Sequence, residues 1–500
     1  MSAHPSVRLR RARLSIALAL VLLPLHATAG EPTLEELARR LQALEQRLGA
    51  GSKPADATGA DATGTESTGA ESTVAATSVA GLDQRLRVIE RRLELQAEEA
   101  AAKAAKDPVV SLGPKELSIK SPSSDGIEVK FKALVQGDGR FYLDDESNPQ
   151  NDGFLLRRVE PTLEGSWGPL VGFRVQAQLA GDSASINDAY LDLRFDPRAT
   201  LRVGKYKQPF GLEQLQSAGS LAMVERGLPT ELTPGRDYGV QLQGELASST
   251  LNYAVGVFNG TVDGRDGPGS NPDDELEATA RVFWEPFKNA ANAWSGLGVG
   301  IATSVTDNFG AGNNVLPRYR TPGQVQFFGY RAEAAADGLH RRWSPQGYYY
   351  AGPFGLLGEY VSSEQEVALV AGADAGRVEH LENTAWQLSG SWVLTGEDAS
   401  YRGIARPNHP FTTGAAGWGA LELVARYGEL DVDDDAFPLF ANPASSASQA
   451  NAWSLGFNWY LTQNLKLVAT YTQTTFDGGA AAGADREDEK TLFTRAQLSF

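Results

Sequence analysis

The sequence predicts an all-β transmembrane barrel of about sixteen antiparallel strands, preceded by an N-terminal coiled-coil arm. Three observations support this fold class. Residues 126–500 alternate apolar and polar side chains with a period of two, which is typical of strands that bury one face. Every Phe, Trp and Tyr lies at or after Phe131, so the preceding residues cannot build a core of the same kind. A secretory segment precedes both parts.

Residues 1–29 have the organisation of a signal peptide. Four arginines between Arg8 and Arg13 precede an apolar run over residues 14–25, and Ala27-Thr28-Ala29 follows as a cleavage site of small residues. The apolar run is shorter than the ~20 residues of a spanning helix, and no other stretch approaches that length. An N-terminal membrane anchor is the alternative interpretation.

Residues 30–106 predict an arm of two short helical segments, at 30–48 and 82–106. Leucine or isoleucine recurs every three or four residues in both, which is typical of a coiled-coil seam: Leu34, Leu37, Leu41, Leu44, Leu48, Leu82, Leu86, Ile89 and Leu93. The linker at 49–81 is rich in Gly, Ser, Thr, Ala and Asp and has too little apolar surface to fold. We expect a self-associating arm in the periplasm; a solvated helix on a monomer is the alternative.

After a second linker at 107–125, residues 126–500 hold about seventeen runs that resemble strands. Single-chain bacterial barrels have even strand numbers, so sixteen is the expected count. A soluble sandwich would use the same alternation with its apolar faces packed inward. The barrel is favoured because seven tryptophans fall within or at the ends of these runs, and because Phe500 closes the last strand as a terminal aromatic residue.

Composition excludes several classes of function. The chain has no cysteine, which removes disulfides, thiolate metal sites and cysteine nucleophiles. Its formal net charge of -17 would become -21 without the four arginines of the signal peptide, so a nucleic-acid partner is not expected. Outside residues 1–29, only His340, His380 and His409 are histidines, and no metal or nucleophile motif surrounds them. We therefore expect no enzyme activity, no cofactor and no metal.

Several segments of the barrel region resemble, in order, the phosphate-selective porin O/P family. They are "FLLRRVEPTLEGSWG" (Phe154 to Gly168), "LRVGKYKQPFGLE" (Leu201 to Glu213), "MVERGLP" (Met223 to Pro229), "VLTGE" (Val393 to Glu397), "LELVARYGEL" (Leu421 to Leu430) and "GFNWYLTQNLKLVATY" (Gly456 to Tyr471). The resemblance implies a homotrimer of sixteen-stranded barrels in the outer membrane of a Gram-negative bacterium, in contact with lipid and lipopolysaccharide. It also implies pores that conduct phosphate-like anions, and it does not cover the arm.

The same resemblance implies five residues that line the pore and bind anions: Arg157, Arg158, Arg226, Arg318 and Arg320. Guanidinium groups replace the lost hydration of phosphate with forked, charge-assisted hydrogen bonds. Strand alternation places Arg158 on the polar face and Arg157 on the opposite one. Both can face the pore only if the strand bulges at this point. Surface or interface charge is the alternative role for the pair.

Residues 207–236 do not alternate and contain several prolines and glycines, so they predict a long connection between strands. Folded into the lumen, this segment would narrow the pore and carry Arg226 to the constriction; an extracellular lid is the alternative. Two positions depart from the family pattern, because Gln214 and Ala133 stand where the family has a lysine and an arginine. Without these two cations, the resemblance does not imply that the pore prefers phosphate over other anions.

We therefore predict a passive outer-membrane porin for anions such as phosphate or polyphosphate, with the arm in the periplasm. Two alternatives stay open. One is a weakly selective diffusion pore in the same barrel. The other is an adhesion or envelope-tethering protein in which the coiled-coil arm carries the function.

Overall fold

The computed structural model describes residues 79–104, 107–113, 116–123, 125–146, 149–414 and 416–500, together with Arg39 and Gln42. The chain divides into two compact units, residues 1–105 and 106–500. The predicted signal peptide at 1–29 and nearly all of the predicted segments at 30–48 and 49–81 lie outside the described residues.

In the first unit, helix α2 (Val79–Ala104) occupies most of the second predicted arm segment. Leu86 is buried and Ile89 and Leu93 are partly buried, whereas Val88 and Leu95 are exposed. The less exposed face is the predicted seam, but pairing of this helix with another copy stays a prediction. None of the helices that the structure describes combines the length and the apolar content required to cross a membrane.

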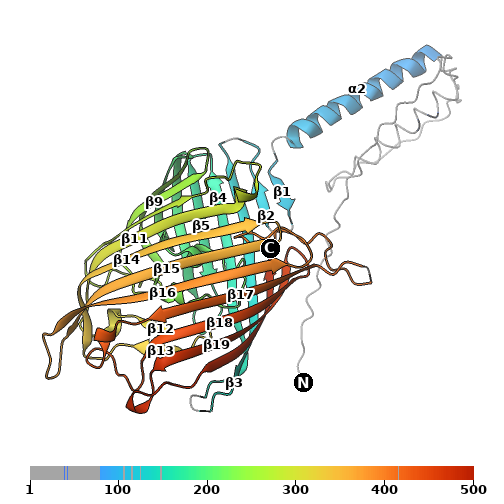
Figure 1. Cartoon of the computed structure of the whole chain (residues 1–500). Coiled ribbons are helices and arrows are strands. Elements are labelled where there is room, and N and C mark those ends of the chain that lie inside the picture. Colours follow the sequence, from blue (N-terminus) through green and yellow to red (C-terminus); the bar gives the residue numbers. More distant parts are fainter. Residues whose placement is uncertain are drawn as a thin grey trace, which may run out of the picture. The chain divides into compact units, whose positions relative to one another are not determined.

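In the second unit, one antiparallel sheet of eighteen strands contains a closed barrel (Figure 1). All but β1 and β2 belong to the barrel wall, which therefore has sixteen strands. These are β3 (Ile127–Leu143), β4 (Gly153–Trp167), β5 (Val171–Gln178), β6 (Ser185–Asp196), β7 (Ala199–Lys207), β8 (Arg236–Leu246), β9 (Leu251–Phe258), β10 (Glu277–Trp284), β11 (Leu297–Phe309), β14 (Ala334–Ala351), β15 (Phe354–Leu369), β16 (Val378–Val393), β17 (Ala420–Asp431), β18 (Ala447–Tyr460), β19 (Leu465–Gly478) and β20 (Glu489–Ser499). Strand β20 pairs with β3 and closes the wall.

The predicted linker at 107–125 contains regular structure. Strands β1 (Val109–Leu112) and β2 (Leu117–Lys120) form a hairpin, and β2 pairs with β3 from Phe131 back to Glu128. The two runs are too short to stand out by periodicity, and pairing with the start of β3 is a tertiary effect. The stretch therefore extends the sheet instead of only connecting two parts.

The two ends of the barrel differ in the length of the connections between their strands. One end, here called the turn end, has most of the short connections and also holds Ile127 and Phe500. The opposite loop end has three of the four longest ones, at 208–235, 259–276 and 310–333. The connection at 394–419 is long although it belongs to the turn end. The remaining short elements lie in connections: α3 (Leu212–Leu215), η1 (Leu228–Leu232), η2 (Ala293–Gly296), η3 (Asn313–Val315), η4 (Asp434–Ala436), η5 (Ala481–Gly483), and the hairpin of β12 (Arg318–Arg320) and β13 (Gln326–Gly329).

The strands turn their apolar faces outward. In β11, Val299, Ile301 and Val305 are exposed, whereas Ser304 and Thr306 on the other face are buried. Tryptophans of the strands are exposed on the same outer side, namely Trp167, Trp284, Trp343, Trp386, Trp392 and Trp453. An apolar outer belt with aromatic residues and a polar interior is the arrangement of a transmembrane barrel. The sandwich alternative is therefore wrong.

Inside the wall, the long connections pack against one sector of the barrel. Phe210, Leu228 and Leu232 from residues 208–235 join Tyr319, Phe327 and Phe328 from residues 310–333 in one buried apolar cluster with strands β14 to β18. This cluster includes Val361, Leu381, Ala385 and Leu430 from the wall. Apolar residues on the inner face here hold the connections in place.

A second attachment inside the barrel is ionic. Arg342 on β14 is fully buried and contacts Asp263 Oδ1 and Glu277 Oε1, each at 2.6 Å, while its NH2 donates to the carbonyl of Thr261 at 2.6 Å. Asp263 and Thr261 belong to the connection at 259–276. The ion pairs therefore fix this connection to the wall.

Asp263→Asn is expected to destabilise the barrel by about 3–5 kcal/mol, because a buried arginine loses one of its two carboxylate partners. The measurement is the midpoint of urea unfolding of the refolded protein. Asp307→Asn is the control, because Asp307 is exposed on the outer face of β11. Equal midpoints for the two variants would contradict the structural role.

Candidate functional site in the barrel lumen

Residues 208–235 cross the lumen from β7 and reach the opposite wall. The backbone N–H groups of Leu212 and Glu213 donate to the Glu359 carboxylate on β15, at 2.8 and 3.2 Å. Farther along the segment, the carbonyls of Leu221 and Ala222 accept hydrogen bonds from Lys466 on β19 and Asn458 on β18. Strand alternation fails here because Pro209, Pro229 and Pro234 interrupt the ladder. We call residues 208–235 the inner segment.

Glu225 of the inner segment is the centre of an arginine cluster. Arg157 Nε and Arg140 NH2 each lie 2.7 Å from Glu225 Oε1, and Arg495 NH2 lies 3.6 Å from the same oxygen. Arg495 also forms a bidentate ion pair with Asp138, in which Nε and NH2 donate to the two carboxylate oxygens. Burial alone would raise the pKa of Glu225, but the nearby arginines hold that pKa well below its usual range. Glu225 is therefore ionised at neutral pH.

The pair Arg157 and Arg158 lies at a β-bulge. Gln136 on β3 pairs with Arg158, but the next residue, Gly137, pairs with Leu156, so Arg157 has no partner in the ladder. The bulge lets both arginines reach the interior, where Arg157 contacts Glu225 and Arg158 NH1 donates to Gln136 Oε1 at 2.8 Å. Arg157 is thus neutralised by a carboxylate, which the sequence did not indicate.

Arg158 is less completely neutralised than Arg157. Its side chain is buried, and its nearest carboxylate oxygen is Glu160 Oε1 at 3.6 Å from Nε. The charges of Arg157, Arg226 and Arg495 all act on it. Several positive charges therefore lie close together around this position.

Arg226 has its hydrogen bonds to the backbone of the inner segment. Its Nε donates to the Glu213 carbonyl at 3.1 Å and its NH2 to the Gln216 carbonyl at 3.0 Å. Among the described residues, no carboxylate lies within ion-pair distance of Arg226. Carbonyl groups satisfy the donors but do not cancel the charge. Arg226 therefore keeps its positive charge in the lumen.

Three further cations contact the same backbone. Lys207 Nζ donates to the carbonyls of Gln214 and Gln216, at 2.6 and 3.0 Å. Lys466 Nζ donates to the Leu221 carbonyl at 2.7 Å, and Arg426 NH1 to the Glu225 carbonyl at 3.0 Å. Of these three, only Arg426 has a carboxylate partner among the described residues, Glu213 at 3.3 Å. The inner segment is therefore surrounded by excess positive charge.

Sequence reasoning missed Lys207, Lys466, Arg426, Glu225, Arg140 and Arg495. Lys207, Glu225, Arg426 and Lys466 all stand inside the quoted motifs, and Glu225 is next to Arg226, which was selected. Arg140 and Arg495 alternate in phase with other polar residues of their strands, which indicates a lumenal face. Periodicity does not indicate which strands the inner segment approaches, so it could not select these residues.

Arg318 and Arg320 form a separate group near the end of η1. The backbone N–H of Arg320 donates to Glu231 Oε2 at 2.9 Å, and Arg265 NH2 donates to the Arg318 carbonyl at 3.1 Å. Burial raises the pKa of Glu231 to about 7. No direct contact among the described residues joins this group to Arg157, Arg158 or Arg226. The five predicted residues thus lie in two groups.

The two departures from the family pattern have different surroundings. Gln214 contributes a carbonyl to Lys207, so a cation stands beside the position where the family has its lysine. Ala133 exchanges backbone hydrogen bonds with Phe500 at the end of the chain. Its neighbour Lys132 contacts Glu164 at 2.5 Å and Glu116 at 3.4 Å. Lys132 therefore supplies a charge here, but in ion pairs.

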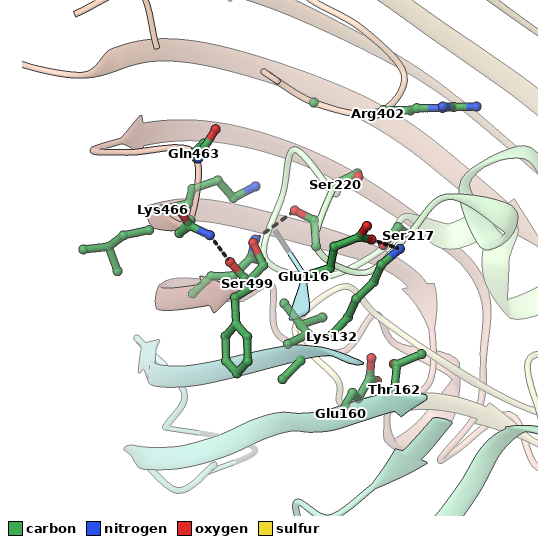
Figure 2. Close-up of a pocket in the computed structure, with 18 of the residues that line it drawn as sticks. Glu116, Lys132, Glu160, Thr162, Ser217, Ser220, Arg402, Gln463, Lys466 and Ser499 are labelled. Carbon is green, nitrogen blue, oxygen red and sulfur yellow. Dashed lines mark hydrogen bonds and ion pairs between the residues drawn. The ribbon is translucent and has the colours of Figure 1, made fainter. Parts of the chain in front are cut away.

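A cavity of about 450 Å³ lies at the turn end of the lumen (Figure 2). Lys132, Lys466 and Arg402 line it from β3, β19 and the connection at 394–419. Glu116 and Glu160 also line it and balance part of this charge. The cavity adjoins Ser217 and Ser220 of the inner segment, so it leads from the turn end to the region of the excess cations.

Comparison with known proteins gives consistent results for the barrel. A family model described as "Phosphate-selective porin O and P" matches residues 129–500. Porin O of Pseudomonas aeruginosa is 23% identical over 373 residues, which cover 70% of this chain and 82% of that protein. The outer membrane channel DcaP of Acinetobacter baumannii is 14% identical with a TM-score of 0.49, covering 76% of this chain and 99% of that one. An anion-selective porin from Comamonas acidovorans is 12% identical with a TM-score of 0.45, covering 75% and 100%.

Proposed function

Because the chain belongs to the phosphate-selective porin O and P family of outer-membrane porins, we propose that its barrel conducts phosphate-like anions passively through a cation-lined constriction at the inner segment. The solute gradient is the only driving force. Arg226 and Arg158 are the residues that carry this proposal, and Lys207 and Lys466 assist them. Arg157 has a positioning role instead, because its charge is paired with Glu225.

The observation that supports this proposal most directly is the bonding of Arg226 to carbonyl oxygens. Its guanidinium is held in a fixed position, yet it has no carboxylate partner among the described residues. A fixed, unneutralised cation in a narrow polar lumen attracts anions and repels cations. Several such charges in succession let an anion pass from one to the next without being trapped.

Phosphate discrimination within this function rests on forked hydrogen bonds from arginine. The weakly selective pore is the second candidate, because four of the lumenal arginines share carboxylates: Arg140, Arg157, Arg426 and Arg495. These groups hold the structure together and are less available to a permeating ion. The two candidates differ in whether phosphate competes with chloride.

We also propose that the turn end faces the periplasm, as the short turns of bacterial outer-membrane barrels do. The loop end then faces the outside, next to lipopolysaccharide. With this orientation, the arm lies in the periplasm and its seam of Leu86, Ile89 and Leu93 is available for pairing in a homotrimer.

Reversal potentials in a planar bilayer test the proposed function. In a gradient of potassium chloride, the reversal potential of the purified protein is expected to have the sign of a channel that conducts anions in preference to cations. Phosphate added at millimolar concentration is expected to reduce the chloride current. The physical reason is competition for the same guanidinium groups. A chloride current that does not respond to phosphate would support the weakly selective pore. Complete absence of channels would support the tethering alternative.

A further inference from the structure

A second lumenal cavity at the turn end, of about 1120 Å³, plays no part in the function proposed above. It is bounded by Leu212 and Leu215 of the inner segment, by the inner faces of β8 to β10 and β14, and by residues 398–402 of the connection at 394–419. Its size exceeds what a single inorganic phosphate requires. We call it the aromatic cavity, after the four rings that line it.

The four rings form a continuous wall of Phe283, Tyr348, Tyr350 and Tyr401. The centroid of Tyr348 lies 5.1 Å from Phe283, 5.4 Å from Tyr350 and 5.3 Å from Tyr401, on which it stacks. The Tyr401 hydroxyl donates to the Leu212 carbonyl at 2.5 Å, so this wall is attached to the inner segment. The Tyr350 hydroxyl has no hydrogen-bond partner among the described residues. An apolar surface of rings tilted by 38° and 52° to their neighbours, with a free hydroxyl on Tyr350, therefore faces the lumen.

Arg281 stands beside this wall with part of its guanidinium unused. Its carbon Cζ lies 4.6 Å from the centroid of Phe283, and its Nε and NH2 donate only to Gln346 Oε1, at 3.0 and 2.8 Å. Three of its five N–H groups are left. In the part of the chain that the structure describes, no carboxylate forms an ion pair with Arg281. Arg281 is thus free to bind an anionic group.

A smaller cavity of about 360 Å³ shares Arg281, Leu215, Glu245 and Asn252 with the aromatic cavity. Lys207 and Arg202 line it as well. Arg202 is neutralised by Asp192, but Lys207 contacts only carbonyl groups. An anionic group at Arg281 would therefore lie between the two cavities, with a second cation nearby.

The rest of the polar lining of the aromatic cavity includes carboxylates, amides and two further cations. These are Glu245, Glu285, Asp398, Asn252, Asn292, Lys288 and Arg402, and Lys288 is paired with Glu285 at 2.7 Å. Carboxylate and amide oxygens accept hydrogen bonds from hydroxyl groups. This lining suits a solute that combines one phosphate group with a ring and several hydroxyl groups.

We propose that the aromatic cavity is a binding site for a phosphorylated sugar during passage. The phosphate group binds Arg281, one face of the sugar ring packs on Tyr348 and Tyr350, and the sugar hydroxyls bind the carboxylate and amide groups of the opposite lining. Pockets that combine an apolar wall with a few fixed polar groups are typical of small-molecule sites. This inference deepens the proposed function, because it rests on passage of phosphate-bearing solutes and names one class of them.

Block of the chloride current by glucose 6-phosphate, compared with inorganic phosphate and glucose, tests the proposal. Glucose 6-phosphate is expected to block the wild-type channel at about tenfold lower concentration than phosphate, since ring packing is expected to contribute about 1.4 kcal/mol, which is a factor of ten. Tyr350→Leu is expected to abolish that difference, and Tyr350→Phe to retain most of it. Arg281→Gln is expected to weaken block by glucose 6-phosphate about tenfold. Glucose alone is not expected to block.

The matched control is Tyr349→Leu, because Tyr349 is the next residue of β14 and contacts Trp294 on the outer side of the wall. Equal changes from Tyr350→Leu and Tyr349→Leu would overturn the sugar phosphate site. Equal block by phosphate and glucose 6-phosphate in the wild-type channel would overturn it as well. A channel blocked by glucose 6-phosphate in a Tyr350-dependent way, but not by phosphate, would instead contradict the proposed function and support the site.

Discussion

Replacing Arg226 with glutamine is expected to lower the anion-to-cation permeability ratio of the channel about tenfold. The guanidinium is fixed by the carbonyls of Glu213 and Gln216, and no carboxylate among the described residues pairs with it. A unit charge about 10 Å from an ion interacts with it by about 1.7 kcal/mol at an effective dielectric constant of 20. A difference of about 1.4 kcal/mol is a factor of ten in an equilibrium constant. Removal of this one charge therefore changes selectivity strongly.

The measurement is the reversal potential of the reconstituted channel in a tenfold gradient of potassium chloride. Arg226→Lys keeps the charge and is expected to keep most of the selectivity, although it loses the forked geometry for phosphate. Arg341→Gln removes the same formal charge from an exposed residue on β14 that is paired with Glu364. A shift in Arg341→Gln as large as that in Arg226→Gln would mean that overall charge, and not the lumenal position, sets selectivity.

The barrel itself could be predicted because its signal is repeated along the chain. Each strand has polar residues on one face and apolar ones on the other, and Phe500 marks the last strand. The sequence also indicated that the strand must bulge at Arg157 if both arginines face the pore, because Arg157 and Arg158 are adjacent in the strand. The register shift between β3 and β4 meets that condition.

The partners of the charged residues could not be predicted in the same way. Glu225 pairs with Arg140 on β3, Arg157 on β4 and Arg495 on β20, which are far apart in the sequence. Those contacts depend on how the inner segment crosses the closed barrel. A sequence pattern gives the face of a strand but not the depth or direction of such a crossing.

The hairpin of β1 and β2 and the connection at 394–419 show the same limit. The hairpin is too short to stand out, and it is stabilised by pairing with β3. The connection at 394–419 places Tyr401 against Leu212 in the lumen. Its many glycines and prolines predict a loop, but they do not indicate that the loop folds inward.

Glu225→Gln is expected to change selectivity in the opposite direction, and raise the anion-to-cation permeability ratio about tenfold. Glutamine has nearly the same shape, so the change removes one negative charge from among Arg140, Arg157 and Arg495. Arg495 keeps its pair with Asp138, whereas Arg157 loses its only carboxylate partner among the described residues. Arg157 then contributes an uncompensated charge to the lumen and joins Arg158 and Arg226 in attracting anions.

Glu231→Gln is the matched control, because Glu231 also belongs to the inner segment but its pKa is raised to about 7 by burial. At pH 6, Glu231 is mostly neutral in the folded protein, whereas Glu225, whose pKa is held well below its usual range, is fully ionised. Reversal potentials at pH 6 are therefore expected to shift in Glu225→Gln and to stay close to wild type in Glu231→Gln. If Glu225→Gln and Arg226→Gln shifted selectivity in the same direction, the cause would be movement of the inner segment and not its charge. Opposite shifts can arise only if the sign of the charge at this segment controls which ions pass.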